Sequence, residues 1–278
     1  MKKPETWRQY ALIGTALTVA VILLGVPLAL IFVKAFGSGA SVLMSQFTDG
    51  DMQHAIKLTL LVAVLTVPIN AVFGILLAWC VTHYRFRGRS LLITLIDIPY
   101  AISPVVAGLC YLVVYGAEGI LGPWLSERQI QLMFAWPGLV MVTIFVTSPF
   151  IARLLIPLMA EQGSDQEHVA LTLGANGWQI FRHVTLPRIK WGVLYAAVIT
   201  NARAIGEFGA VSVVSGAIRG KTLTLPLLVE QLNEDHKVVG AFAAALLLAC
   251  MALLTIILKA SMETVQSRRL RRGLVSHQ

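Results

Sequence analysis

Apolar stretches separated by short polar connections divide the chain into six segments, each long enough to cross a bilayer. The first runs from Tyr10 to Val33 without a charged residue for 24 positions, and about 20 apolar residues suffice to cross a hydrocarbon core of about 30 Å. We expect helical spans at about residues 10–33, 58–82, 91–115, 132–152, 191–215 and 238–258. Prolines inside several segments are compatible with helices whose neighbours satisfy the freed carbonyl groups. The pattern therefore predicts an all-α integral membrane protein with six transmembrane helices.

The basic residues of the connections predict how these helices are oriented. The connections on the side of both termini carry 15 lysines and arginines, and those on the opposite side carry 6. Basic residues concentrate on the cytoplasmic side of membrane proteins. We therefore expect a cytoplasmic N-terminus (residues 1–9), a cytoplasmic basic tail (residues 261–278) and a cytoplasmic loop at residues 161–187.

This loop, EQGSDQEHVALTLGANGWQIFRHVTLP, is the longest polar stretch on that side. It predicts a short amphipathic helix that ends at Gly174, because a glycine just past a helix end readily adopts a left-handed conformation. A second helix then leads back into the membrane, and Pro187 suits its first turn. Two interpretations are open: an interfacial helix lying on the headgroups, or a knob that fits a cleft on a soluble partner.

Composition agrees with a membrane location and narrows the partners. Of the 278 residues, 57% are hydrophobic and 13% charged, and the mean hydropathy is +0.77, values outside the range of soluble domains. The formal charge of +8 follows from the topology and from contact with anionic membrane lipid. We expect no nucleic-acid partner.

The fifth span carries two charges, Arg203 and Glu207, one helical turn apart. Ionisable residues inside a membrane usually face a bundle interior or a wet cavity. The pair either neutralises itself within the helix or lines a translocation pathway, with Arg203 offering a positive potential to an anion. Ser212 and Ser215 lie farther toward the outer mouth and could donate hydrogen bonds to an oxyanion. For Asp97, in the third span, we expect a partner at a helix end or in a loop.

Enzyme motifs are not found in the sequence. It contains no H-E-x-x-H zinc motif, no G-x-S-x-G nucleophile elbow and no G-x-x-x-x-G-K-[ST] phosphate loop. We therefore expect no catalytic residue, no metal site and no cofactor in this chain. If ATP drives its activity, another subunit must bind the nucleotide.

Within the 161–187 loop, the spacing of Gly174, Val184 and Leu186-Pro187 resembles the "EAA" loop of ABC-importer permeases, which contacts the ATPase subunit. Counting back from the glycine, His168 takes the place of the family's glutamate, and Glu167 lies one position early. The resemblance implies a coupling role for a set of loop residues: Glu167, His168, Ala170, Leu173, Gly174, Ala175, Leu186 and Pro187.

Residues 10–260 as a whole resemble the permease subunits of bacterial sulfate/thiosulfate ABC importers. The resemblance is strongest in DMQHAI (51–56), DIPYAISPVVAG (97–108) and NARAIGEFGAVSVVSGAIRG (201–220). It implies the type I importer permease fold in a bacterial inner membrane and a heterodimer with a homologous permease subunit. It also implies two ATP-binding subunits, which hold ATP and Mg, and a periplasmic sulfate/thiosulfate-binding protein.

Two other functions remain open. The 201–220 block is shared in part with molybdate permeases, so a molybdate or tungstate ABC permease is one alternative. The other is an ion-coupled secondary anion transporter that uses Arg203, Glu207 and Asp97 as a relay. Such carriers usually have internal inverted repeats, and none is evident in the sequence.

Overall fold

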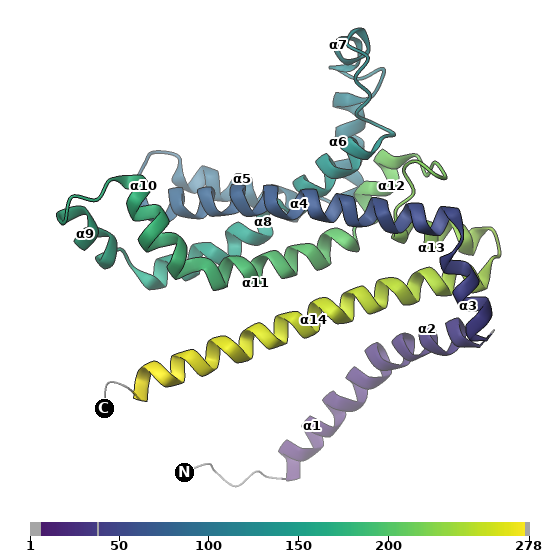
Figure 1. Cartoon of the computed structure of the whole chain (residues 1–278), viewed down its shortest axis with the longest axis horizontal. Helices are drawn as coiled ribbons and strands as arrows, with labels where there is room; N and C mark the ends of the chain where they lie inside the picture. The colour runs from purple at the N-terminus through teal and green to yellow at the C-terminus, as the bar shows by residue number, and fades with distance from the viewer. Residues whose placement is uncertain (1–6, 38, 276–278) are drawn as a thin grey trace.

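A computed structural model describes residues 7–37 and 39–275, and every regular element within these ranges is a helix (Figure 1). In chain order the elements are α1 (Trp7–Ala20), the π-helical turn η1 (Val21–Gly25), α2 (Val26–Phe36), α3 (Ala40–Phe47), α4 (Gly50–His83), α5 (Arg89–Ala101), α6 (Pro104–Tyr115), α7 (Gly122–Glu127), α8 (Trp136–Gln162), α9 (Asp165–Thr172), α10 (Gly177–Ile180), the π-helical turn η2 (Phe181–Thr185), α11 (Leu186–Ile205), α12 (Gly209–Ser215), α13 (Leu225–Glu234) and α14 (Val238–Val275).

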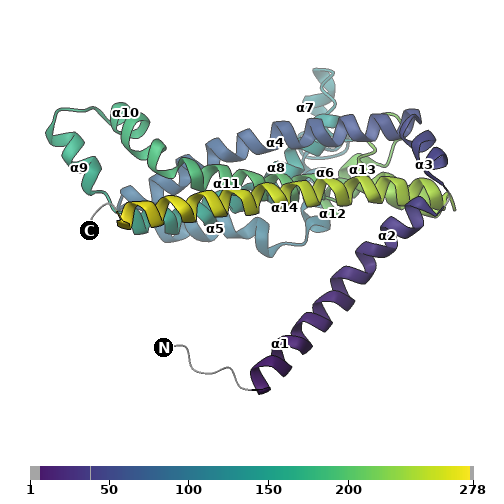
Figure 2. The ribbon, with the colours of Figure 1, turned by 60° about the horizontal axis from the view of Figure 1, so that its bottom comes forward.

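The long helices α4, α8, α11 and α14 run along the long axis of the molecule (Figure 1). The short helices α9 and α10 lie at one end of this bundle, where α14 also ends, while α3 and α13 lie at the other end. Helices α1 and α2 diverge from the bundle, which both views show (Figure 2). The loop between α8 and α11 therefore projects beyond the packed helices.

Four helical segments are long and apolar enough to cross a membrane singly: Gln9–Phe36, Gly50–His83, Trp136–Gln162 and Val238–Met262. Two bent pairs satisfy the same criterion jointly. One joins α5 to α6 with a bend of 104°, and the other joins the Gly177–Ile205 helix to α12 with a bend of 52°. The chain is thus a multi-pass helical protein with four to six spans, and the count of six stays a prediction.

The expected third span, at residues 91–115, is not one straight helix. Its break falls at Ser103, whose backbone is extended (φ −57°, ψ 134°), directly before Pro104. The proline ring clashes with a preceding residue in the α conformation and favours an extended one. Pro104 then begins α6, where its missing N–H costs no hydrogen bond.

Close approach of α4 and α8 forms the centre of the bundle. Gly74 of α4 lies directly against Ile151 of α8, where a Cβ atom would come within 2.6 Å of the isoleucine side chain. One turn away, the buried Asn70 Nδ2 donates to Thr147 Oγ1 at 2.7 Å. Nearer the 161–187 loop, a separate apolar cluster joins α4, α8 and α11: Ala78, Ile151, Leu155, Met159, Ile189 and Ala196. This cluster supports the two ends of the loop.

Candidate functional site: the loop between α8 and α11

Hydrogen bonds at Gly174 end helix α9 in a compact turn. Gly174 has φ +83°, which glycine adopts without the Cβ clash that other residues meet. Its N–H donates to the carbonyl of Leu171, and the next N–H, that of Ala175, donates to the carbonyl of Ala170. This pair of bonds is a Schellman motif. The conformation expected at Gly174 from the sequence is confirmed.

A capping box begins the next helix two residues later. The side chain of Asn176 accepts a hydrogen bond from the N–H of Gln179, whose side chain accepts one from the N–H of Asn176. These reciprocal bonds satisfy N–H groups that a helix start leaves without partners. The path of the loop is therefore fixed on both sides of its glycine.

Pro187 lies in the first turn of α11, as expected, but the helix does not begin afresh there, because helical structure runs continuously from Gly177 to Ile205. The wide turn η2 comes immediately before α11, and the N–H of Leu186 bonds to the carbonyl of Phe181. A proline inside an α-helix clashes with the carbonyl four residues earlier, and a π turn relieves that clash by widening the helix. The same arrangement recurs where η1 precedes Pro27.

The tip of the loop exposes apolar side chains. Leu173 is 82% exposed, and Val169 and Leu171 are also exposed. Beside them is a hollow of about 430 Å³ lined by Ala170, Leu173, Gly174, Ala175, Gln179, Ile180, His183 and Val184. No atom lies within 4 Å of the position that a Cβ on Gly174 would occupy. The tip thus combines a hollow, apolar side chains and an unobstructed backbone, as a protein-docking surface does.

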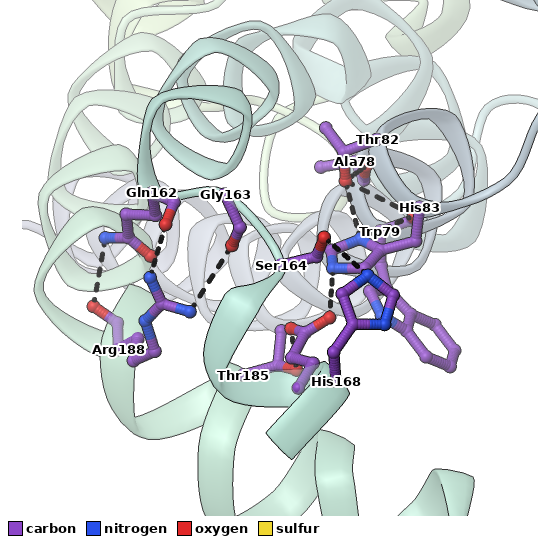
Figure 3. Close-up of polar contacts among 11 residues, drawn as sticks. Ala78, Trp79, Thr82, His83, Gln162, Gly163, Ser164, His168, Thr185 and Arg188 are labelled. Carbon is purple, nitrogen blue, oxygen red and sulfur yellow. Dashed lines mark hydrogen bonds and ion pairs between the residues drawn. The ribbon is translucent and has the colours of Figure 1, made fainter. Parts of the chain in front are cut away.

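Glu167 contacts the bundle rather than this tip, through His83 of α4 and Thr185 of η2, both of which are labelled in Figure 3. Its Oε2 lies 2.5 Å from His83 Nε2 at the end of α4, and its Oε1 accepts a hydrogen bond from Thr185 Oγ1 at 2.6 Å. The side chain of Glu167 is only 11% exposed and that of His83 17%. Both carboxylate oxygens are therefore occupied within the chain.

Hydrogen-bonding groups lie against both ring nitrogens of His83. Nδ1 lies 3.3 Å from the carbonyl of Trp79, which can only accept, and 2.9 Å from Thr82 Oγ1. The Thr82 hydroxyl also donates to the carbonyl of Ala78 at 2.7 Å. Nε2 faces a carboxylate, which also accepts. Nε2–H therefore donates to Glu167, and the contacts of both ring nitrogens hold the imidazole in one orientation.

A second polar clamp closes the base of the loop. Arg188 of α11 donates from Nη2 to the carbonyl of Gln162 at 2.6 Å and from Nη1 to that of Gly163 at 3.4 Å (Figure 3). These carbonyls lie at the end of α8, where a helix leaves acceptors without partners and a cation is favourable. The loop is therefore attached to α4, α8 and α11 by charged contacts.

The other predicted coupling residues occupy varied positions. His168 is exposed, with Nε2 3.0 Å from Ser164 Oγ, so the side chain at the family's glutamate position contacts its own loop. Ala170 and Ala175 are half-buried, Leu186 packs against the α4–α8–α11 cluster, and Pro187 is exposed. The contacts of the loop with His83, Thr185 and Arg188 were not predicted, because the separation of these residues along the chain gives no local signal.

The predicted pathway residues lie around the bend between α11 and α12. Arg203 Nη1 is 2.6 Å from Glu207 Oε2, and the Glu207 side chain is 1% exposed against 34% for Arg203. Glu207 Oε1 also accepts from the N–H of Ala210 in the first turn of α12. Ser212 donates to the carbonyl of Gly209 in its own helix, and the buried Ser215 accepts from the N–H of Ala217. Of these four side chains, Arg203 is the charged group with an accessible end.

Comparisons with known proteins agree with this architecture. The family model described as "Binding-protein-dependent transport system inner membrane component" matches residues 70–272. "Sulfate transport system permease protein CysW" of Escherichia coli (strain K12) is 56% identical over 261 residues, covering 94% of this chain and 90% of that protein. The chain belongs to the CysW-type permeases of binding-protein-dependent ABC transporters.

Other relatives of this permease include both types of subunit in sulfate systems. The CysW protein of Synechococcus elongatus is 48% identical, covering 98% of this chain and 95% of that protein. "Sulfate transport system permease protein CysT" of Escherichia coli (strain K12) is 34% identical, covering 95% and 94%. Among solved structures, a chain of a bacterial alginate ABC transporter in complex with its periplasmic protein superposes with a TM-score of 0.75 at 21% identity, covering 95% of each chain. That likeness shows the fold.

Proposed function

We propose that this permease is one of the two membrane subunits of an ATP-driven importer for sulfate, and that its 161–187 loop transmits movement from an ATP-binding subunit. The observation that carries the proposal is the loop itself. Its tip presents Leu173 and a hollow to the outside, while charged contacts attach its inner side to three long helices. Its CysW and CysT relatives are named as permeases of sulfate transport systems, which supports sulfate as the substrate.

The attachment of the loop defines a mechanical path. Force on the tip reaches α4 through Glu167 and His83, and it reaches the junction of α8 and α11 through Arg188. When ATP brings the two ATP-binding subunits together, their movement tilts these helices and opens the pathway toward the periplasm. Hydrolysis returns the bundle to its inward-facing arrangement. Such transmission needs an element that moves as one piece, which the two clamps supply.

The remaining partners follow from this assignment. The second membrane subunit is a homologous CysT-type permease, and ATP and Mg bind to the two ATP-binding subunits. A periplasmic binding protein delivers the anion and supplies most of the selectivity. Both termini and the loop lie in the cytoplasm of a bacterial inner-membrane protein. Thiosulfate, a dianion of similar shape, uses the same route.

Substitution of Gly174 by asparagine tests the role of the loop. Asparagine tolerates the left-handed conformation and no atom of this chain obstructs its Cβ, so the loop keeps its fold while a side chain enters the docking surface. We expect loss of the ATP-binding subunit on copurification and uncoupling of ATP hydrolysis from sulfate uptake. Gly88→Asn is the matched control, because Gly88 has φ +98° and equally open surroundings on the same side of the bundle but outside the loop.

The outcomes separate the rival functions. Unchanged assembly and uptake in Gly174→Asn would refute the docking role and favour a loop that lies on lipid headgroups. Sulfate uptake into proteoliposomes that persists without ATP and stops with an ionophore would identify an ion-coupled carrier. Uptake of molybdate with no response to sulfate would identify the other oxyanion class.

A further inference from the structure

An ion pair outside the 161–187 loop joins α5 to α8. Arg153 Nε donates to Asp97 Oδ1 at 2.7 Å, and the two side chains are 45% and 40% exposed. Asp97 was expected to have a partner at a helix end or in a loop, but its partner lies well inside α8. Asp97 is eight residues beyond the start of α5 and Arg153 nine before the end of α8, which is about 12–14 Å along each helix.

This depth restricts what can lie against the pair. Helix α8 has 27 residues, about 40 Å of helix, whereas the hydrocarbon core is about 30 Å thick. With α8 centred on the core, each end extends about 5 Å beyond it, and the pair lies several ångströms inside. A charge facing acyl chains there costs about 2.5–3.5 kcal/mol on insertion scales. A half-exposed pair at this depth therefore faces water or polar protein.

Asp97 and Tyr100 hold the guanidinium of Arg153 in one orientation. Its Cζ lies 4.6 Å from the centre of the Tyr100 ring, and Asp97 fixes Nε. Among the residues that the structure describes, neither Nη atom of Arg153 has a hydrogen-bond partner. A planar guanidinium held on one edge and one face presents its other edge in the geometry that binds an oxyanion through two hydrogen bonds.

The position of Arg153 along the bundle relates it to Arg203. Gly192 of α11 packs against Leu155 and Leu158 of the antiparallel α8, so Arg153 is level with the segment of α11 near residue 195. Arg203 lies about two helical turns, or about 11 Å, farther from the loop. The two arginines thus lie at successive depths along the bundle, between the bend of α11 and the loop end.

We propose that Arg153, positioned by Asp97 and Tyr100, binds the translocated oxyanion on the inner half of the pathway. This inference rests on the proposed function and adds a contact to it. Its ligand is a tetrahedral dianion, and water covers the face of α5 and α8 that carries the pair. Asp97 balances the charge of Arg153, which keeps the contact weak enough for the anion to leave toward the cytoplasm.

Cysteine labelling tests whether this face is wet. In proteoliposomes that hold the complex with Cys80, Cys110 and Cys250 replaced by alanine, Tyr100→Cys and Arg153→Cys should react with a charged, membrane-impermeant thiol reagent applied from the loop side. Sulfate should slow labelling of Tyr100→Cys, where Arg153 remains in place. Leu95→Cys is the control, because Leu95 is 49% exposed but lies two residues from Asp97 and so on the opposite face of α5; it should not react.

Transport measurements test the anion contact itself. Arg153→Gln should lower kcat/KM for sulfate by about tenfold, the size of one charge-assisted hydrogen bond in partly aqueous surroundings, and Arg153→Lys should recover part of it. Asp97→Asn frees the guanidinium and should lower KM and kcat together. Unreactive cysteines at both positions, labelling indifferent to sulfate, or normal kcat/KM in Arg153→Gln would each overturn the proposal. A cysteine-free parent without ATP-dependent sulfate uptake would instead overturn the proposed function.

Discussion

The ion pair between Glu167 and His83 should determine how tightly uptake is coupled to ATP hydrolysis. In Glu167→Gln the side chain keeps its shape but has one acceptor oxygen instead of two. Either the Nε2–H of His83 or the hydroxyl of Thr185 must then face the amide NH2 group, which is also a donor. A hydrogen bond to a charged group contributes about 1.5–3 kcal/mol, and both partners are more than four-fifths buried. We therefore expect the anchored state of the loop to lose about 2 kcal/mol.

A loss of this size changes the ratio of anchored to released loop by a factor of about 30, since each 1.4 kcal/mol is tenfold. Hydrogen exchange of the backbone amides of α9 in the assembled complex should accelerate by a similar factor, provided that release limits exchange. In proteoliposomes, more ATP should be hydrolysed for each sulfate imported, because a released loop moves without moving α4. The tip is unaltered, so copurification of the ATP-binding subunit should persist.

The control for this experiment is Glu161→Gln, which removes the same charge from an exposed position in the last turn of α8. A double-mutant cycle with His83→Gln isolates the pair, because the double variant should be little worse than either single one. Unchanged exchange and stoichiometry in Glu167→Gln would refute the anchoring role. Equal changes in Glu161→Gln would attribute the effect to the net charge of the loop.

Three further substitutions test the packing and the bend. Thr59→Val should lower the free energy of unfolding of the complex by about 1–3 kcal/mol, measured from its thermal unfolding, because the buried Thr59 Oγ1 accepts a hydrogen bond from the N–H of Leu225 at 2.9 Å. Thr59→Ser keeps this acceptor and should be near normal. Gly74→Val should prevent assembly, judged by membrane yield, because its side chain would overlap α8. Arg203→Ala should destabilise the protein by leaving the Glu207 carboxylate buried without its partner. The double variant Arg203→Ala/Glu207→Gln should recover stability. Sulfate uptake that stays low in this double variant would place Arg203 in the pathway.

Hydropathy and local backbone rules anticipate much of this structure. Long apolar runs predict the helices of the bundle because burial in lipid requires internally satisfied backbone groups, and Gly174 ends α9 as its residue type indicates. The bend at Ser103-Pro104 is also a local effect, but hydropathy does not register it because both sides of the break are apolar. An interpretation based on hydropathy alone therefore joins α5 and α6 into one straight helix.

Contacts between distant residues were not predictable in the same way. Glu167 lies next to His168, and the sequence assigns both to one docking surface, but the helical turn directs Glu167 toward α4 and leaves His168 outside. The pairing of Asp97 with Arg153 depends on the relative register of two helices. Register follows from the packing of the whole bundle, which local patterns do not specify.

The π turn η2 has a consequence for changes in the length of the loop. A wide turn of this kind is equivalent to one residue inserted into an α-helix, and each α-helical residue advances the azimuth by about 100°. The wide turn absorbs that rotation, so removing one residue from Phe181–Thr185 would close it into an ordinary α turn and restore the clash between the ring of Pro187 and the carbonyl four residues earlier. A single-residue deletion or insertion at this point changes how the docking element joins the bundle, so we expect the length of this short stretch to matter more to the loop than its composition.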